Sequence, residues 1–401
     1  MQRLWPAARP SHNTMLVVEC EATIDEGRVR RAIDGFLDVC PWPAARLRRA
    51  FPWGKLHWAV RRRGALLSPP VRALAPADVH AFLEAELADA IDPWRDPPLR
   101  VSVVDTRLVL TWFHPLMDPR GGQNLLGHLA RVDEQGGWAG MPPAFVASPE
   151  SRPLRERGRL ARRSVAYMRA LMAGSPVSPG TRLATPGRPR FRQERFADRA
   201  GRHESRHITW RLAVVGRAMA QLWQRRGLPD VPFLVPISVD LRAKGDPEPT
   251  FGNALAFHFA RFRPSDTGDL TTLERQLRAQ MVAAMREEQI EANRVAMEFL
   301  HYRPLSMMLR DLPGTANGET FSFNCADVGD FPARLRSVFG RRIVNAYHVP
   351  AVLPRPGLGV FFNRCAGREN LVVSWVDGAV GDDDVHGIVE AVREAMEWTR
   401  D

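Results

Sequence analysis

The sequence of 401 residues predicts a mixed α/β fold made of two domains. Hydrophobic residues make up 45% of the chain, which is enough for two cores of ordinary size. Apolar residues recur with the period of strands in some stretches and with the period of helices in others. Between 141 and 204 the composition changes, because Pro, Gly and Arg become frequent and large apolar residues become sparse. We therefore expect a first domain at 1–140, a connector at 141–204 and a second domain at 205–401.

In the first domain, strands and helices are expected to alternate. Apolar runs bounded by turn residues predict strands at 14–22, 51–60, 99–104 and 108–113. Helices are predicted to begin around Asp25 and Asp78, because each of these acidic residues precedes a helical apolar face. A third helix is expected to open after a Gly121-Gly122 turn.

The connector and the second domain continue this alternation. A short helix is expected at 154–172, and 174–193 is expected to be the most flexible part of the connector. Further helices are predicted at 214–226, 270–299 and 382–398, the last beginning with three aspartates that suit a helix N-terminus. The predicted strands are 206–212, 232–241, 251–260, 320–324, 341–349, 357–364 and 370–376.

The charge of the chain favours anionic partners without identifying one. The formal net charge is +11, and Lys55 and Lys244 are its only lysines. No consecutive basic run is longer than Arg61-Arg62-Arg63, and basic residues do not interleave with aromatic ones, so nucleic-acid binding is the weakest alternative. No uncharged apolar stretch approaches 18 residues, so we expect no membrane insertion. A cytoplasmic monomer is expected.

The cysteines and histidines do not form a metal-binding pattern. No Cys-x-x-Cys pair is present, so the cysteines are expected to be buried or incidental thiols. They are Cys20, Cys40, Cys325 and Cys365. His203 and His207 are four residues apart, but they lie at a predicted strand entry with no third ligand nearby. No metal site is expected.

The most informative motif follows the strand predicted at 108–113. His114 comes directly after this strand, and Asp118 follows four residues later. A chain with 11 histidines and 45 acidic residues is expected to contain about one such spacing by chance, so the context must decide. In one interpretation Asp118 is a helix N-cap with Pro119 at the first helical position. In the other, His114 is a general base. Both hold together if the carboxylate that starts the helix also fixes the loop that presents His114.

A second group of residues agrees with the catalytic interpretation. Asp240-Leu241-Arg242 is followed by Gly245-Asp246-Pro247 and then by Phe251-Gly252-Asn253. With the strands at 99–104 and 108–113 before His114, this order resembles the condensation-domain and chloramphenicol-acetyltransferase-like (HxxxD) acyltransferase superfamily over nearly the whole chain. The resemblance implies two chloramphenicol acetyltransferase-like sandwich subdomains in a V-shaped pseudodimer, with the active site in a tunnel between them. The HxxxD motif would then lie in the subdomain at 1–140.

The resemblance also implies roles for individual residues. His114 would take a proton from an amine or hydroxyl group as that group attacks the carbonyl of an acyl thioester. Asp118 would point away from the substrate and hold the loop. Arg242 is its candidate partner for an ion pair, and the alternative is that Arg242 is an ordinary surface arginine. The residues expected to support the motif, besides Arg242, are Gly121, Gly122, Gly252 and Asn253. The candidates for contact with the oxyanion or the substrate are Ser322 and Asn324. For Ser322 and Asn324, structural hydrogen bonding is the alternative.

The donor implied by the resemblance is acyl-CoA or the phosphopantetheinyl acyl thioester of an acyl or peptidyl carrier protein, with no permanently bound cofactor. Phe113 stands where condensation domains carry a first histidine, and Pro119 replaces the usual glycine. The Asp-Phe-Gly-Trp-Gly motif of plant BAHD enzymes is absent. We predict a stand-alone condensation-like acyltransferase of nonribosomal peptide, polyketide or lipid metabolism. The alternative is a non-catalytic condensation-like module that docks a carrier protein or synthase.

Overall fold

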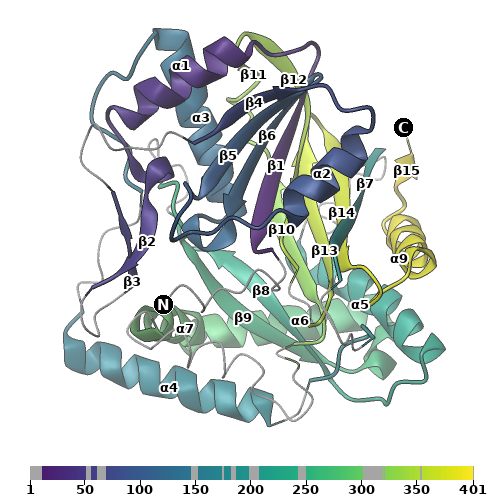
Figure 1. Ribbon diagram of the computed structural model, residues 1–401. Helices are drawn as coiled ribbons and strands as arrows, with labels where there is room; N and C mark the ends of the chain where they lie inside the picture. The colour runs from purple at the N-terminus through teal and green to yellow at the C-terminus, as the bar shows by residue number, and fades with distance from the viewer. Residues whose placement is uncertain are drawn as a thin grey trace.

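The computed structural model describes residues 11–50, 56–60, 69–145, 152–173, 176–181, 187–197, 207–242, 250–300, 319, 321–352 and 355–400. Two larger sheets splay apart in this structure, and helices cover their outer faces (Figure 1). A two-stranded ribbon with three helices around it lies below them. The chain therefore folds as a mixed α/β protein of two halves.

The first sheet has the strand order β11-β12-β1-β6-β5-β4. Its strands are β1 (Asn13–Cys20), β4 (Val71–Leu74), β5 (Leu99–Val104), β6 (Arg107–Phe113), β11 (Ser337–Val338) and β12 (Arg341–Val349). One face packs against α1 (Glu26–Leu37) and α3 (Pro119–Gln135), and the other packs against α2 (Val79–Ala88). A small hairpin of β2 (Arg46–Arg49) and β3 (Leu56–Ala59) lies beside them, after the short helix η1 (Trp42–Ala44).

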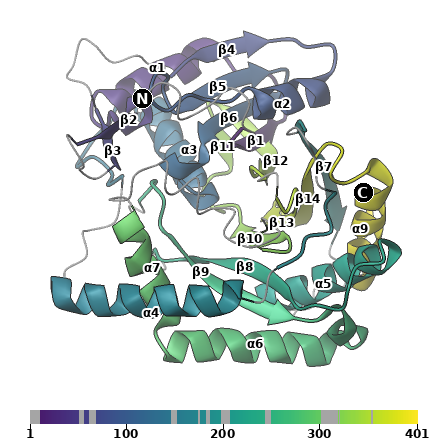
Figure 2. The same cartoon turned by 60° about the horizontal axis from the view of Figure 1, so that its bottom comes forward.

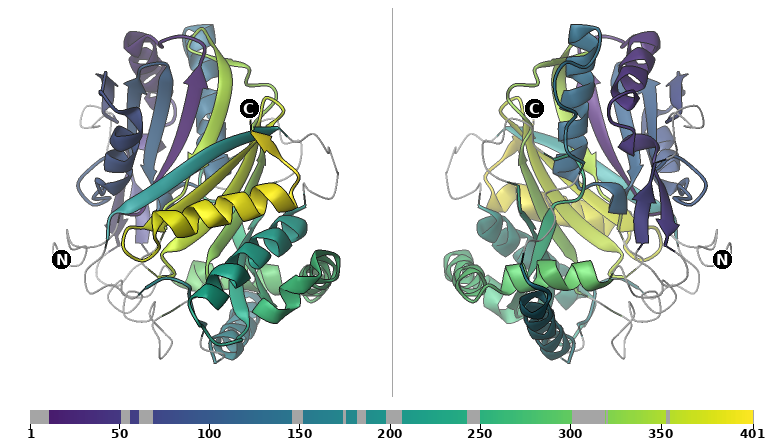
Figure 3. Two further views of the ribbon diagram at one scale, coloured as in Figure 1. Left: turned by 90° about the vertical axis from the view of Figure 1, so that its right-hand side faces the viewer. Right: turned by 90° about the vertical axis from the view of Figure 1, so that its left-hand side faces the viewer.

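The second sheet has the order β10-β13-β14-β7-β15. Its strands are β7 (Pro189–Ala197), β10 (Asn324–Asp330), β13 (Leu358–Cys365), β14 (Arg368–Val376) and β15 (Thr399–Arg400). Its core is closed by α5 (Ile208–Arg225) and by α9 (Asp382–Ala395), which lies across the sheet in yellow in the left view of Figure 3.

The ribbon below the second sheet consists of β8 (Phe233–Asp240) and β9 (Leu255–Phe262). The helices around it are α4 (Leu154–Met172), α6 (Leu270–Arg286) and α7 (Gln289–Leu300), with the short η4 (Pro264–Gly268) after β9. Figure 2 shows α4 and α7 together at the edge of the molecule. They share a small apolar cluster formed by Leu160, Ala292 and Val295.

Two strands lie in a different sheet from the one their sequence range suggests. β12 belongs to the range 205–401, yet it pairs with β1 from the start of the chain. β7 lies in the range expected to be a connector, yet it pairs with β14 along its whole length and buries Phe191 and Phe196. The expected flexibility of 174–193 is therefore wrong for the residues that begin β7. The division at 140 and 204 stays a prediction, and the sheets exchange segments across it.

Other differences concern element type and boundaries. The strand predicted at 206–212 is wrong, because α5 begins at Ile208 and buries Leu212 on its helical face. The helix predicted at 270–299 is two helices, since Glu288 adopts a positive φ of 52° between them. Gly121 and Gly122 lie in the first turns of α3 and do not form a turn before it. The strand predicted at 320–324 begins only at Asn324 and runs on to Asp330.

Candidate active site

His114 lies where β6 ends and the short helix η2 (His114–Leu116) begins. Its backbone N–H donates to the carbonyl of His12 at 2.9 Å, which extends the pairing of β1 with β6 by one residue. The half-buried ring places Nδ1 3.4 Å from the carbonyl oxygen of Met117. The tautomer with its proton on Nδ1 satisfies this contact and leaves the lone pair of Nε2 free.

The loop between His114 and Asp118 is held from inside the core. The buried indole of Trp112 donates its Nε1–H to the same Met117 carbonyl at 2.7 Å. Gly122 packs directly on this ring, because a Cβ there would lie 2.7 Å from Cη2 of Trp112. Trp112 therefore fixes both the loop and the start of α3.

Asp118 is fully buried and accepts three hydrogen bonds. Its Oδ1 accepts from the N–H of Gly121 at 2.7 Å, which makes Asp118 the N-cap of α3, with Pro119 at the first helical position. Its Oδ2 accepts from the N–H of Ala254 at 2.7 Å and from Nη2 of Arg242 at 2.9 Å. The N-cap and the ion pair expected for Asp118 are thus both present in one carboxylate.

Arg242 connects this carboxylate to the segment at 250–252. Its side chain is 5% exposed and donates to the carbonyls of Thr250 at 2.8 Å and Gly252 at 2.6 Å, as well as to Asp240 at 2.9 Å. Gly121 lies against this segment so closely that a Cβ there would overlap the carbonyl oxygen of Phe251. The expected roles of Gly121, Arg242 and Gly252 therefore have a geometric basis.

The other residues of the sequence group that follows Arg242 are not part of its contact with Asp118. Asn253 is exposed, and Gly245-Asp246-Pro247 lies outside the described residues. The role of Asn253 in supporting the motif stays a prediction.

Arg120 forms a further connection that the sequence did not reveal. Its guanidinium donates to Gln123 at 2.8 Å and to the carbonyls of Val328 at 2.5 Å and Asp330 at 2.8 Å, in and at the end of β10. Burial lowers the pKa of Arg120. An arginine in the first turn of a helix is usually solvent-exposed, so no sequence signal indicated that this one joins the motif to the second sheet.

Gln123 continues this network into the first sheet. Its Nε2 lies 3.1 Å from Nε2 of His348, whose buried ring stands edge-on to Trp112 with the ring centroids 6.3 Å apart. Burial lowers the pKa of His348 to about 3. His348 is therefore a neutral hydrogen-bonding group near the motif.

The two candidate oxyanion contacts have different surroundings. Ser322 is fully buried, and its Oγ accepts from the N–H of Leu234 at 3.1 Å while its own N–H donates to the Leu234 carbonyl at 2.8 Å. This is the structural hydrogen bonding that was the alternative. Asn324 is half-buried at the start of β10, opposite Gly359 of β13. A contact of either side chain with an oxyanion stays a prediction.

Within the described ranges, no group of three or more His, Cys, Asp or Glu side chains could hold a metal ion. His203 lies outside these ranges. No described helix has the length and apolar character needed to cross a membrane. The four cysteines are free and buried, and burial raises the pKa of Cys20 and Cys365 to about 11 and that of Cys40 to about 12.

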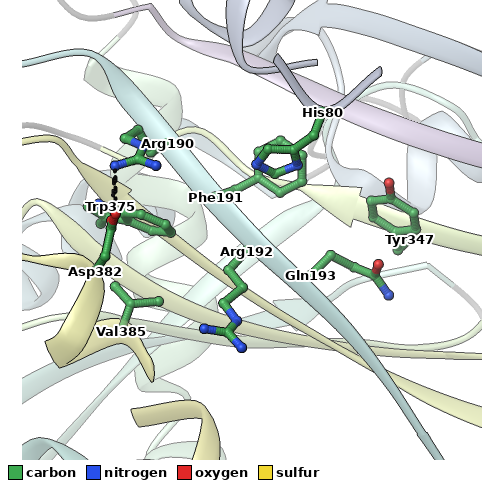
Figure 4. Close-up of a pocket in the computed structure, with 9 residues that line it drawn as sticks. All are labelled: His80, Arg190, Phe191, Arg192, Gln193, Tyr347, Trp375, Asp382 and Val385. Carbon is green, nitrogen blue, oxygen red and sulfur yellow. Dashed lines mark hydrogen bonds and ion pairs between the residues drawn. The ribbon is translucent and has the colours of Figure 1, made fainter. Parts of the chain in front are cut away.

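A cavity of about 300 Å³ lies between α2, β7 and α9, away from the motif (Figure 4). Arg190 crosses it to Asp382 at 2.9 Å, with its guanidinium 5.2 Å from the ring of Trp375. His80 and Phe191 close another side, with ring centroids 4.8 Å apart. No residue of the HxxxD motif lines this cavity, so it carries none of the chemistry assigned to that motif.

Comparison with known proteins identifies the class of fold. No family model and no curated protein matches the sequence. The structure, however, has the fold of condensation domains over nearly its whole length.

Three solved structures illustrate this. A double mutant of the starter condensation domain of rhizomide synthetase RzmA in complex with C8-CoA aligns at a TM-score of 0.69 and 15% identity, with 99% of this chain and 91% of that chain covered. The first condensation domain of the calcium-dependent antibiotic synthetase, in complex with substrate analogue 3a, aligns at a TM-score of 0.68 and 15% identity, with 98% of this chain and 93% of that chain covered. The epimerization domain from the third module of tyrocidine synthetase B aligns at a TM-score of 0.60 and 12% identity, with 97% of this chain and 91% of that chain covered. At these identities the likeness shows the fold, which more than one kind of domain shares.

Proposed function

We propose that this chain is a condensation-like acyltransferase. It transfers an acyl group from a CoA or carrier-protein thioester to an amine or hydroxyl acceptor, with His114 as the general base. The observation that carries this proposal is the buried Asp118, whose oxygens are bound by Gly121, Ala254 and Arg242. The carboxylate fixes the loop, and the ring of His114 remains half-exposed at the end of β6.

The proposed reaction balances with His114 alone as proton carrier. The acceptor nitrogen or oxygen attacks the thioester carbonyl carbon while Nε2 of His114 removes its proton. The new C–N or C–O bond forms, the C–S bond breaks, and the imidazolium returns the proton to the leaving sulfur. The Nδ1 contact with Met117 orients the ring for this step.

The substrate class rests on the structural neighbours. A variant of the RzmA starter domain was crystallised with C8-CoA and Leu-SNAC, an acyl thioester and an aminoacyl thioester. The neighbours belong to synthetases of rhizomide, the calcium-dependent antibiotic and tyrocidine. We extend the thioester donor and the setting in specialised metabolism from these proteins to this chain.

A non-catalytic module that docks a carrier protein or synthase is the second candidate. Phe113 favours it, because this buried side chain packs against the rings of His12 and Trp58 where condensation domains carry a first histidine. Pro119 does not favour either candidate, since it starts α3 without disturbing the cap. Binding of a carrier protein without turnover of any acyl thioester supports this second candidate.

The decisive experiment replaces His114 with Ala and measures products by mass spectrometry with panels of acyl thioesters and amine or alcohol acceptors. We expect the rate to fall by about 100- to 10,000-fold, because that is the usual contribution of a general base. His80→Ala is the matched control, since His80 is exposed and lines the separate cavity. Full activity of His114→Ala with an intact circular dichroism spectrum would overturn the proposal.

A further inference from the structure

A second cavity, of about 350 Å³, runs along the outer side of α3. Its other wall is the segment 332–337, which joins β10 to β11. Figure 2 shows α3 beside β11 at this place. The volume lies at the lower end of the range that small-molecule sites occupy.

The charges on this cavity are unbalanced. Arg131, Arg334 and Arg336 line it, against the one carboxylate of Glu134. Arg334 and Arg336 are exposed and have no ion pair within the described part of the chain. Arg131 lies with its guanidinium 4.0 Å above the ring of Trp138. The cavity between α2 and α9 differs, because Arg190 there is bound by Glu84 and Asp382.

One wall of the cavity is formed by α3, which begins directly after Asp118 of the motif. Gly127 lines the cavity between Gln123 and Arg131, and a Cβ on this residue would meet no atom within 4 Å. Gln123 lies at the near end, where it accepts a hydrogen bond from Arg120. At about 1.5 Å per helical residue, the cavity extends from about 8 to about 26 Å along α3 from Asp118. One extended ligand can therefore place an anionic end in this cavity and a reactive end near the motif loop.

We propose that this cavity binds the phosphate groups of the thioester donor; this inference rests on the proposed function. Arginine suits this ligand, because its planar fork of N–H donors matches phosphate oxygens and keeps its charge. Arg334 and Arg336 approach from one wall and Arg131 from the other. Coenzyme A and the phosphopantetheine arm of a carrier protein share this phosphate chemistry, and the experiments below distinguish the two sources.

The first experiment measures binding of CoA and of pantetheine, which has no phosphate, by isothermal titration calorimetry. Arg334→Ala/Arg336→Ala should weaken CoA binding at least about tenfold. Arg155→Ala/Arg159→Ala is the control, because these arginines of α4 are also exposed and have no ion pair in the described part of the chain. Equal affinity of the wild type for CoA and pantetheine, or unchanged CoA affinity of the Arg334/Arg336 variant, would overturn the proposal.

The second experiment uses Gly127, which lines the cavity. Gly127→Glu places a carboxylate in the cavity and should abolish CoA binding, whereas Gly127→Ala should leave it unchanged. Both substitutions favour the helix, since each replaces a helical glycine with a better helix former. Retained CoA binding in Gly127→Glu would contradict the assignment.

Kinetics identifies the source of the phosphate. If KM of Arg334→Ala/Arg336→Ala rises at least about tenfold for both acyl-CoA and acyl carrier protein, the cavity binds the phosphate group next to pantetheine, which both donors carry. A rise for acyl-CoA alone assigns it to the nucleotide phosphates, and no rise for either donor overturns the site. His114→Ala should keep the CoA affinity of the wild type. Arginine-dependent CoA binding without transfer by the wild type would refute the proposed function and leave the site intact.

Discussion

Two buried arginine–carboxylate pairs show how the same interaction serves different purposes in the motif loop and in the core of the second half. Asp118 and Arg242 join residues 124 positions apart, and the carboxylate also accepts from two backbone N–H groups. Glu369 and Arg211 join β14 to α5 at 3.0 Å, with Asp327 3.4 Å from the same guanidinium. The first pair holds backbone on both sides, because Asp118 accepts from two N–H groups and Arg242 donates to two carbonyls.

The electrostatics of the second pair also differ. Arg211 lies 4.9 Å from the ring of Phe362, and Glu369 is 1% exposed. Burial raises the pKa of Glu369, because the cost of dehydrating the carboxylate exceeds the attraction of Arg211 and Arg364. Backbone donors fix the position of a loop, whereas a pair of side chains mainly compensates for its own burial. The comparison therefore predicts that only the first pair controls transfer.

The largest effect is expected for Asp118→Ala. This change removes the cap of α3, leaves the N–H of Ala254 without its acceptor, and removes the buried partner of Arg242. We expect a loss of about 3 to 5 kcal/mol in the free energy of unfolding, measured by urea denaturation. Transfer per folded molecule should also fall at least about tenfold, because the loop that presents His114 is released. Unchanged transfer by the folded fraction would show that the anchor does not position His114.

A smaller effect is expected for Glu369→Gln. Arg211 keeps Asp327 at 3.4 Å, and glutamine removes a carboxylate whose burial is itself costly. We expect a loss of about 1 to 3 kcal/mol, the range for a buried hydrogen bond to a charged group, and an unchanged kcat. Denaturation and transfer assays on the same preparation test both parts. A fall in kcat comparable with that of Asp118→Ala would refute the distinction between the two pairs.

Sequence patterns predicted the fold best where burial follows a simple period. β5, β12 and α4 have the predicted limits, because their apolar residues recur regularly between clear turn or capping residues. β7 was missed, since Gln193 and Arg195 interrupt the apolar alternation after Phe191 and the strand buries only a few apolar side chains. The start of α5 was taken for a strand, because Ile208-Thr209-Trp210 has strand-forming residues.

For the candidate active site, too, only some residues could be predicted from the sequence. His114, Asp118 and Arg242 were identifiable, because their spacing and order resemble a known motif. Arg120 and His348 were not, since their contacts join residues more than 200 positions apart and exist only once the two sheets have come together. No local pattern distinguishes these two residues from an ordinary surface arginine and an ordinary strand histidine.

The smallest effect concerns His348, a buried ionisable group beside the motif whose protonation is disfavoured by burial and by the charge of Arg120. Its pKa is about 3 in the folded protein, whereas an unfolded histidine titrates near 6.5. Between these values the unfolded chain binds one proton more, so stability falls as the pH falls, by about 1.4 kcal/mol per pH unit. His348→Gln removes this pH-dependent contribution to stability and keeps a hydrogen-bonding partner for Gln123.

Between pH 6.5 and pH 5 the free energy of unfolding of the wild type should therefore fall by about 2 kcal/mol more than that of the variant, as measured by urea denaturation. The exposed His80→Gln is the control and should follow the wild type. Parallel pH dependence of His348→Gln and the wild type would show that the pKa of His348 is the same in the folded and the unfolded chain, and would refute the prediction.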